Sequence, residues 1–144
     1  MTSTDLAHAP RQAVLALAQS LSDGRTVEHL SVPQEGLWLL QIQEPVRHDG
    51  FFIGEVPVGQ ACVALHDGRL GEARGGAILM HADRELATAA AVCDAIARAG
   101  WPGADDVGRL CATGAATRDA VAAVRSAILA ATRVDFAELG QEGA

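Results

Sequence analysis

The sequence predicts an α+β fold in which helices pack on one face of an antiparallel sheet, within a single domain. Apolar residues recur at helical spacing over residues 10–21, 84–99 and 116–131. Between the first two of these helices, residues 26–80 hold extended runs separated by tight-turn signals. The order helix, strands, helix, helix is typical of helices that cover one face of a sheet.

The size and charge of the chain limit its possible roles. Its 144 residues fit one domain over residues 1–144, and a chain of this length buries roughly 68–70% of its unfolded surface. The formal net charge is −7, from 11 basic and 18 acidic residues. Because a nonspecific grip on nucleic acid needs clustered Lys and Arg, we expect no nucleic-acid partner.

The cysteines and the short apolar runs predict a cytoplasmic protein. Cys62, Cys93 and Cys111 are odd in number, widely separated and flanked by apolar residues, which favours reduced thiols over a disulfide framework. No run of about 18 apolar residues is present to span a bilayer, and residues 1–5 lack the features of a signal peptide. We therefore expect no membrane contact.

The N-terminal part is expected to form one helix. Residues 1–9 are polar and are expected to fray. The helix then begins with Pro10 in its first turn, where a missing backbone donor is tolerated, and it ends at Asp23-Gly24.

Residues 26–43 are expected to form a hairpin. Extended apolar runs lie on both sides of residues 33–36, whose sequence Pro-Gln-Glu-Gly is that of a four-residue turn. Residues 44–50 combine Pro, Gly and charged residues without apolar periodicity, which indicates a loop.

A second pair of strands follows. Residues 51–65 are strand-like, but Pro57 and Gly59 are poor inside a central strand and indicate a bulge, a bend or a break. Residues 66–69 contain the Asp-Gly pair of a tight turn, and residues 70–80 are expected to return as the partner strand.

Two helices complete the chain. Asp83 is well placed to cap the helix over residues 84–99, and Gly100 ends it. Residues 101–106 are expected to form a linker, and the final helix is expected to begin near Ala115. Its apolar stripe consists of Val121, Val124, Ile128 and Ala131.

Residues 130–136 suggest docking. Continued as a helix, this segment would place Asp135 within the apolar stripe; extended, it would set Arg133 and Asp135 on one side and Phe136 on the other. An exposed terminal ion pair contributes under about 1 kcal/mol. An arginine and a carboxylate beside a large aromatic residue also suit docking, either on the sheet of this chain or on a partner.

The residue patterns predict no catalytic residue, no cofactor and no metal site. The glycines of residues 68–76 lack a following Lys-Ser/Thr and are interpreted as hairpin and bulge glycines. The five histidines have no close ligand spacing. The serines and cysteines lie outside nucleophile motifs, and Cys62 and Cys93 are interpreted as packing residues.

Four blocks of the sequence occur in the order and spacing of a known family. The blocks are Phe51-Phe52-x-Gly54-Glu55, Val63-x-Leu65-x-Asp67-Gly68-x-Leu70-Gly71, the run from Ala82-Asp83 to Cys93-Asp94-Ala95-Ile96, and residues 130–136. Through them the chain resembles the G subunit of the bacterial carbon-phosphorus lyase system over most of its length from residue 51 onward. It departs after Phe136, where Ala137-Glu138-Leu139 replaces the usual Phe, Thr and Met.

The resemblance implies an accessory or scaffolding role in phosphonate use. The G subunit of that family works with the H, I and L proteins to displace adenine from ATP with an alkylphosphonate, which gives ribose 1-methylphosphonate 5-triphosphate. It belongs to a core complex with the H, I and J proteins, and the chemistry is credited to the I protein. We therefore expect these subunits as partners and expect the chain to be active only as one subunit of the transferase complex.

Five residues are predicted to contribute to interfaces with these partners. Arg133, Asp135 and Phe136 come from the C-terminal segment. Phe51 and Phe52 are neighbours in a strand, so their side chains point to opposite faces of the sheet. One of them is expected in the core and the other against a helix layer or a partner.

Two other classes of function stay open. A stand-alone binding module could hold a small ligand or a peptide with its glycine-rich sheet and the loop at residues 44–50. A self-contained hydrolase with a cysteine or histidine site ranks well below it. Migration with co-expressed partner subunits would separate the subunit from the stand-alone module.

Overall fold

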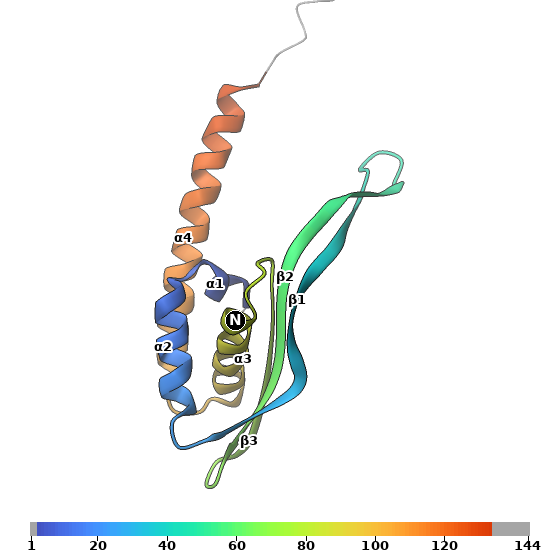
Figure 1. Cartoon of the computed structure of the whole chain (residues 1–144). Helices are drawn as coiled ribbons and strands as arrows, with labels where there is room; N and C mark the ends of the chain where they lie inside the picture. The colour runs from blue at the N-terminus through green and yellow to red at the C-terminus, as the bar shows by residue number, and fades with distance from the viewer. Residues whose placement is uncertain (1–2, 134–144) are drawn as a thin grey trace, which may run out of the picture.

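The computed structural model describes residues 3–133. These residues form four helices and one antiparallel sheet with strand order β1-β2-β3. Figure 1 shows the helices together on one side of the sheet. The predicted α+β fold, with helices on one face of an antiparallel sheet in a single domain, is confirmed. Within the described residues, no helix combines the length and apolar character needed to cross a bilayer.

The N-terminus is more ordered than the sequence predicts. Helix α1 (Ser3–His8) places Leu6 in the core with 0% exposure, so the expectation of fraying is wrong for residues 3–9. An ion pair between Asp5 and Arg118 joins α1 to the last helix. Helix α2 (Arg11–Ser22) follows Pro10 and ends before Asp23-Gly24, as predicted.

Strand β1 (Thr26–Gln43) is one strand of 18 residues, so the predicted hairpin turn at residues 33–36 is wrong. It pairs with β2 (Gly50–Asp67), and the pairing shifts between Ser31 and Gln34, where Pro33 lies. Between these two pairs β1 has one residue more than β2, which is a β-bulge. Because Pro33 lies in this bulge of an edge strand, its missing N–H is tolerated. The predicted loop between β1 and β2 is present.

Strand β2 also continues through the predicted disturbance. Pro57 pairs with Leu37 of β1, but β3 (Gly71–Leu79) pairs with β2 only from Gly59 to Asp67. The proline therefore needs no partner on its second edge. The irregularity in β2 lies instead at Gly54, which has a φ of 150°. Gly54 pairs with Leu40, and the register of the two strands shifts between Leu40 and Gln41.

The turn between β2 and β3 lies where the sequence predicts it. Asp67 holds it, because its Oδ1 accepts from the backbone N–H of Arg69 at 2.9 Å and of Leu70 at 3.1 Å. The positive φ falls on Gly71 rather than on Gly68.

The caps of helix α3 (Arg84–Ala99) are also as predicted. Oδ1 of Asp83 accepts from the backbone N–H of Leu86 at 2.8 Å, and Gly100 adopts a left-handed conformation. Both groups satisfy backbone atoms that a helix end would otherwise leave unpaired.

Helix α4 begins at Ala104, eleven residues before the predicted start, and runs to Ala131. The second half of the expected linker, residues 104–106, is therefore helical. Gly114 explains part of the error, because a Cβ at this position would overlap the carbonyl of Asp5 in α1. Small residues that let another helix approach closely weaken the apolar periodicity from which helices are predicted.

The core lies between the sheet and helix α3. Val63, Leu65, Leu79 and Ile96 are fully buried, and α3 contributes mostly alanines. A Cβ on Gly75 of β3 would overlap the backbone of Ala91 and Ala95, so the sheet and the helix approach each other very closely.

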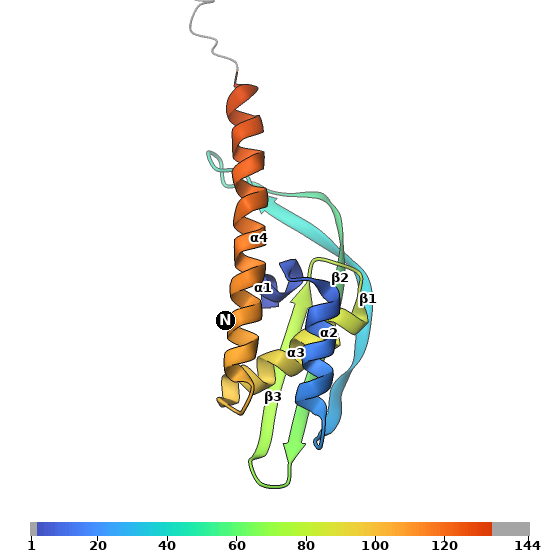
Figure 2. The same ribbon diagram turned by 90° about the vertical axis from the view of Figure 1, so that its left-hand side faces the viewer.

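Two extensions leave this core from the same end (Figures 1 and 2). The first is the far part of the β1–β2 hairpin, residues 36–57, which we call the hairpin arm; none of its residues is buried. The second is the last part of α4, residues 119–131, which we call the helix arm; every residue in it is exposed.

Candidate interface

The hairpin arm carries a dense set of exposed apolar side chains. Phe51 is 45% and Phe52 is 61% exposed, so the expectation that one of them would enter the core is wrong. Their predicted role as interface residues stays a prediction. The other large exposed apolar residues of the arm are Leu37, Trp38, Leu39, Ile42, Val46 and Ile53.

The apolar residues of β1 were missed as interface candidates, although the sequence carries a signal. Residues 37–40 read Leu-Trp-Leu-Leu, a continuous apolar run without the alternation of a half-buried strand. Such a run is typical of strands that are covered on both faces. In the described chain no element covers either face of the arm, so the run indicates contact with another molecule.

The helix arm presents a second apolar surface. The stripe predicted from the sequence is present on α4, but its large side chains lie in solvent rather than on the core: Val121, Val124 and Ile128 are between 48% and 61% exposed. Leu129, which lies outside the predicted stripe, is 70% exposed. A shallow hollow beside Val121 and Val124 is lined almost entirely by apolar atoms. Helices in proteins gain most of their stability from packing of an apolar face, so contact with a partner would stabilise the arm.

Arg133 lies two residues after the end of the helix arm and is exposed. Asp135 and Phe136, the other two predicted interface residues of this segment, lie outside the described residues.

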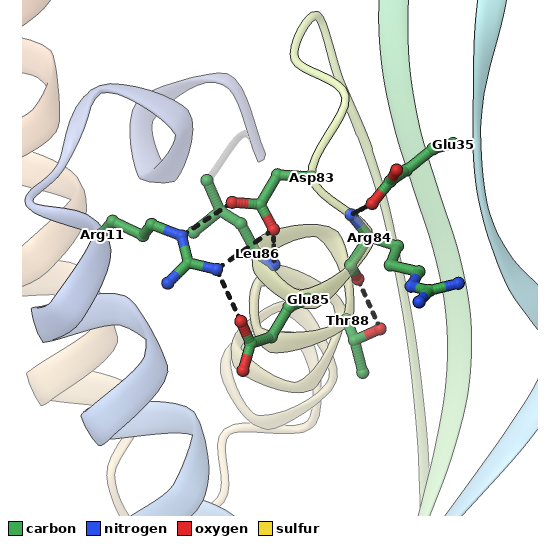
Figure 3. A network of polar contacts seen from close by, with 7 residues as sticks. All are labelled: Arg11, Glu35, Asp83, Arg84, Glu85, Leu86 and Thr88. Atoms are coloured by element: carbon green, nitrogen blue, oxygen red, sulfur yellow. Dashed lines mark hydrogen bonds and ion pairs between the residues drawn. The ribbon is translucent and has the colours of Figure 1, made fainter.

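A polar network fixes the base of the hairpin arm (Figure 3). The Arg11 guanidinium of α2 donates to Asp83 at 2.7 Å and to Glu85 at 2.5 Å, which ties α2 to the start of α3. The backbone N–H of Arg84 donates to Glu35 of β1 at 3.0 Å. Since Glu35 precedes the arm by one residue, this contact attaches the root of the arm to helix α3.

The network also sets the charge of Asp83. The hydrogen bond from Arg11 lowers the pKa of Asp83 below its usual value, and the backbone N–H of Leu86 acts in the same direction. The carboxylate therefore stays ionised while it caps α3 and pairs with Arg11.

The cysteines differ in their surroundings. Burial raises the pKa of the Cys93 thiol to about 12, and burial also raises the pKa of Cys111. Both thiols are thus protonated near neutral pH and are poor nucleophiles. The interpretation of Cys62 as a packing residue is wrong, because this side chain lies exposed on the outer face of the sheet.

No group of three or more His, Cys, Asp or Glu side chains in residues 3–133 is arranged to hold a metal ion. An open groove of about 490 Å³ lies between α2, α3 and the first part of β1, with an apolar floor that includes Leu15, Val27 and Val92. It lies away from the glycine-rich strand and the loop at residues 44–50. Two other open hollows lie in those regions, one of about 380 Å³ beside Gly76 of β3 and one of about 310 Å³ beside Gly50 of β2.

Comparison with known proteins gives one finding of family membership. A family model described as phosphonate metabolism protein PhnG matches residues 2–140 of the 144-residue chain. A search of curated proteins finds no match to the chain.

Proposed function

The chain belongs to the phosphonate metabolism protein PhnG family and so takes part in phosphonate metabolism as a subunit of a multi-protein complex. We propose that it is an accessory or scaffolding subunit of the carbon-phosphorus lyase core complex. In this role it supports the transfer of ribose 5-triphosphate from ATP to an alkylphosphonate, with release of adenine. Its partners are the I, H and J proteins, and the complex works in the cytoplasm.

The observation that carries this proposal is the pair of exposed apolar arms. Soluble monomers rarely expose contiguous apolar patches above a few hundred Å², and larger patches mark protein interfaces. The hairpin arm alone exposes three aromatic side chains, Trp38, Phe51 and Phe52, each by 45% or more. Aromatic residues are enriched among those that dominate binding energy.

The accessory role follows from the resemblance, which credits the chemistry to the I protein. The buried thiols fit this division of labour, because Cys93 and Cys111 are held protonated and point into the core of the subunit. In this chain they pack rather than react.

The C-terminal segment extends the docking surface. Arg133 lies at the end of the helix arm. We place Arg133, Asp135 and Phe136 in the same contact, with the aromatic side chain as the apolar anchor and the arginine as a partner for a carboxylate.

Co-expression tests this function directly. The chain is produced with the I, H and J proteins, only one of which carries an affinity tag, and the purified material is separated by size. We expect the chain to migrate with the tagged subunit in a fixed ratio. Migration of the chain by itself in every combination would contradict the subunit role and favour the stand-alone binding module.

A further inference from the structure

The hairpin arm exposes large apolar side chains on both of its faces, and the second face also holds Gln41 and Glu55. Residues that pair across two strands share a face, and successive residues of one strand alternate between faces. The first face therefore carries two cross-strand pairs, Trp38 with Val56 and Ile42 with Phe51. The second face carries three cross-strand pairs, Leu37 with Pro57, Leu39 with Glu55 and Gln41 with Phe52. Each face carries at least one aromatic residue that is 45% or more exposed.

This apolar band ends before the tip of the arm. The loop at the tip holds Glu44, Arg47, His48 and Asp49, and the side chains of Arg47 and Asp49 are 82% and 75% exposed. On the core side the band ends at Gln34 and Glu35. The band covers residues 37–42 of β1, which span about 20 Å at the usual rise of a strand.

We propose that the hairpin arm inserts into a slot in a partner protein, with one apolar wall against each face and the charged tip in solvent beyond the slot. The inference rests on the proposed function, since the partner is another protein of the same complex. The slot is about 20 Å deep, and its walls are about 20 Å apart if each packs on the arm at the usual 10 Å between layers.

A partner that covers only one face of the arm would not account for the apolar area exposed on the other face. Apart from Val46 at the tip, the seven large apolar side chains of the arm expose on the order of 600 Å² together, given the 150–250 Å² that one aromatic side chain can bury. Covering only one face would leave about half of this area in water, an area comparable to the largest apolar patch of a typical soluble monomer.

The charges favour a different protein over a second copy of this chain. Each copy carries a net charge of −7, and this charge opposes self-association. The tip of the arm pairs Arg47 with Asp49 at 3.8 Å, so it can remain hydrated without a partner of either sign.

Matched substitutions on the two faces test the slot. Phe51→Thr and Phe52→Thr make the same chemical change on opposite faces, and threonine keeps the strand propensity. Val46→Thr is the control, because Val46 is an apolar residue of the tip with 80% exposure. Each full-length variant is titrated against the co-purified partner subunits, and each is melted alone.

We expect both phenylalanine variants to weaken binding about 30-fold or more, as loss of a central anchor does, while Val46→Thr leaves binding unchanged. All three variants should have the same melting temperature as the unchanged chain. If a phenylalanine variant melts early, Trp38→Thr replaces Phe51→Thr and Leu39→Thr replaces Phe52→Thr, since each lies on the same face.

A loss of binding with one face alone, or with neither, overturns the slot while the proposed function stands. A stable dimer of the chain by itself that both variants dissociate overturns the choice of a different protein as occupant. Failure of the unchanged chain to bind any of the subunits overturns the proposed function itself.

Discussion

At the scale of single residues, Gly75 sets the distance between the sheet and helix α3. A Cβ at this position would overlap the backbone of Ala91 and Ala95, which cannot move aside as a side-chain tip can. We expect Gly75→Ala to lower the free energy of unfolding by about 2 kcal/mol or more, because the helix must shift across the core. Denaturant unfolding measures this change. Gly68→Ala is the control, since a Cβ there meets no atom within 4 Å; an equal loss in both variants would contradict the packing argument.

Asp83 combines a helix cap with an ion pair. Asp83→Ala removes the acceptor for the backbone N–H of Leu86 and leaves Arg11 with one fewer partner, so a loss of about 1–2 kcal/mol is expected. Asp83→Asn keeps an acceptor for the cap but removes the charge, so it should cost less. Thermal melts of the two variants beside the unchanged chain measure the difference.

The same residue makes stability depend on pH. Arg11 lowers the pKa of Asp83 in the folded state, so the folded state holds the charged form more strongly than the unfolded state does. This contribution is fully present above the unfolded pKa, near 3.8, and is lost as the pH falls through the lower folded value. The stability advantage of the unchanged chain over Asp83→Asn should therefore shrink as the pH falls below about 4. Unfolding curves from pH 7 to pH 3 check this, and a constant difference would contradict it.

At the scale of elements, the helix arm should bind a partner without supporting the core. Ile128→Glu places a charge in the middle of the apolar stripe, whereas Ser126→Glu places the same charge on the opposite side of the helix. We expect Ile128→Glu to weaken assembly at least tenfold, because a charge buried without a pair is costly. Ser126→Glu should assemble normally, and both variants should have the same melting temperature as the unchanged chain. Equal binding by the two variants would remove the helix arm from the interface.

The segment after the helix arm makes a related prediction. Phe136→Ala should weaken assembly by about 2 kcal/mol or more and leave the melting of the isolated chain nearly unchanged, as expected for an anchor that is buried only in the complex. Arg133→Ala should act in the same direction, because it leaves a carboxylate in a dry contact without its partner. A pull-down and a melt are made side by side. An isolated Phe136→Ala chain that melts early would mean that the segment docks on its own core instead.

At the scale of the whole molecule, the purified chain should not turn over ATP with methylphosphonate. Its two buried thiols are protonated near neutral pH, and the resemblance assigns the chemistry to the I protein. Adenine release is the measured quantity, with the complete set of subunits as the positive control. Adenine release by the chain alone, at the rate of the complex, would contradict the accessory role.

The sequence by itself determined the features that depend on a few neighbouring residues. Asp83 and Gly100 cap helix α3, and Asp67 holds the turn before β3. The two aspartates form hydrogen bonds to backbone groups within four residues, and Gly100 adopts the left-handed conformation because it has no Cβ. The fold class followed from the order of these elements, and the family followed from four short blocks in sequence.

Only the tertiary structure decided which elements continue and which faces are covered. Pro33 reads as a turn residue, yet β1 continues through it because an edge strand with a bulge tolerates a missing donor. Gly114 interrupts the helical pattern, yet α4 runs past it because α1 packs at that point. The apolar residues of the two arms form a stripe and runs of the kind that buried residues form, yet they lie in solvent in the structure. Periodicity indicates which apolar side chains are to be buried, whereas the packing of distant elements decides whether they are buried against this chain or against a partner.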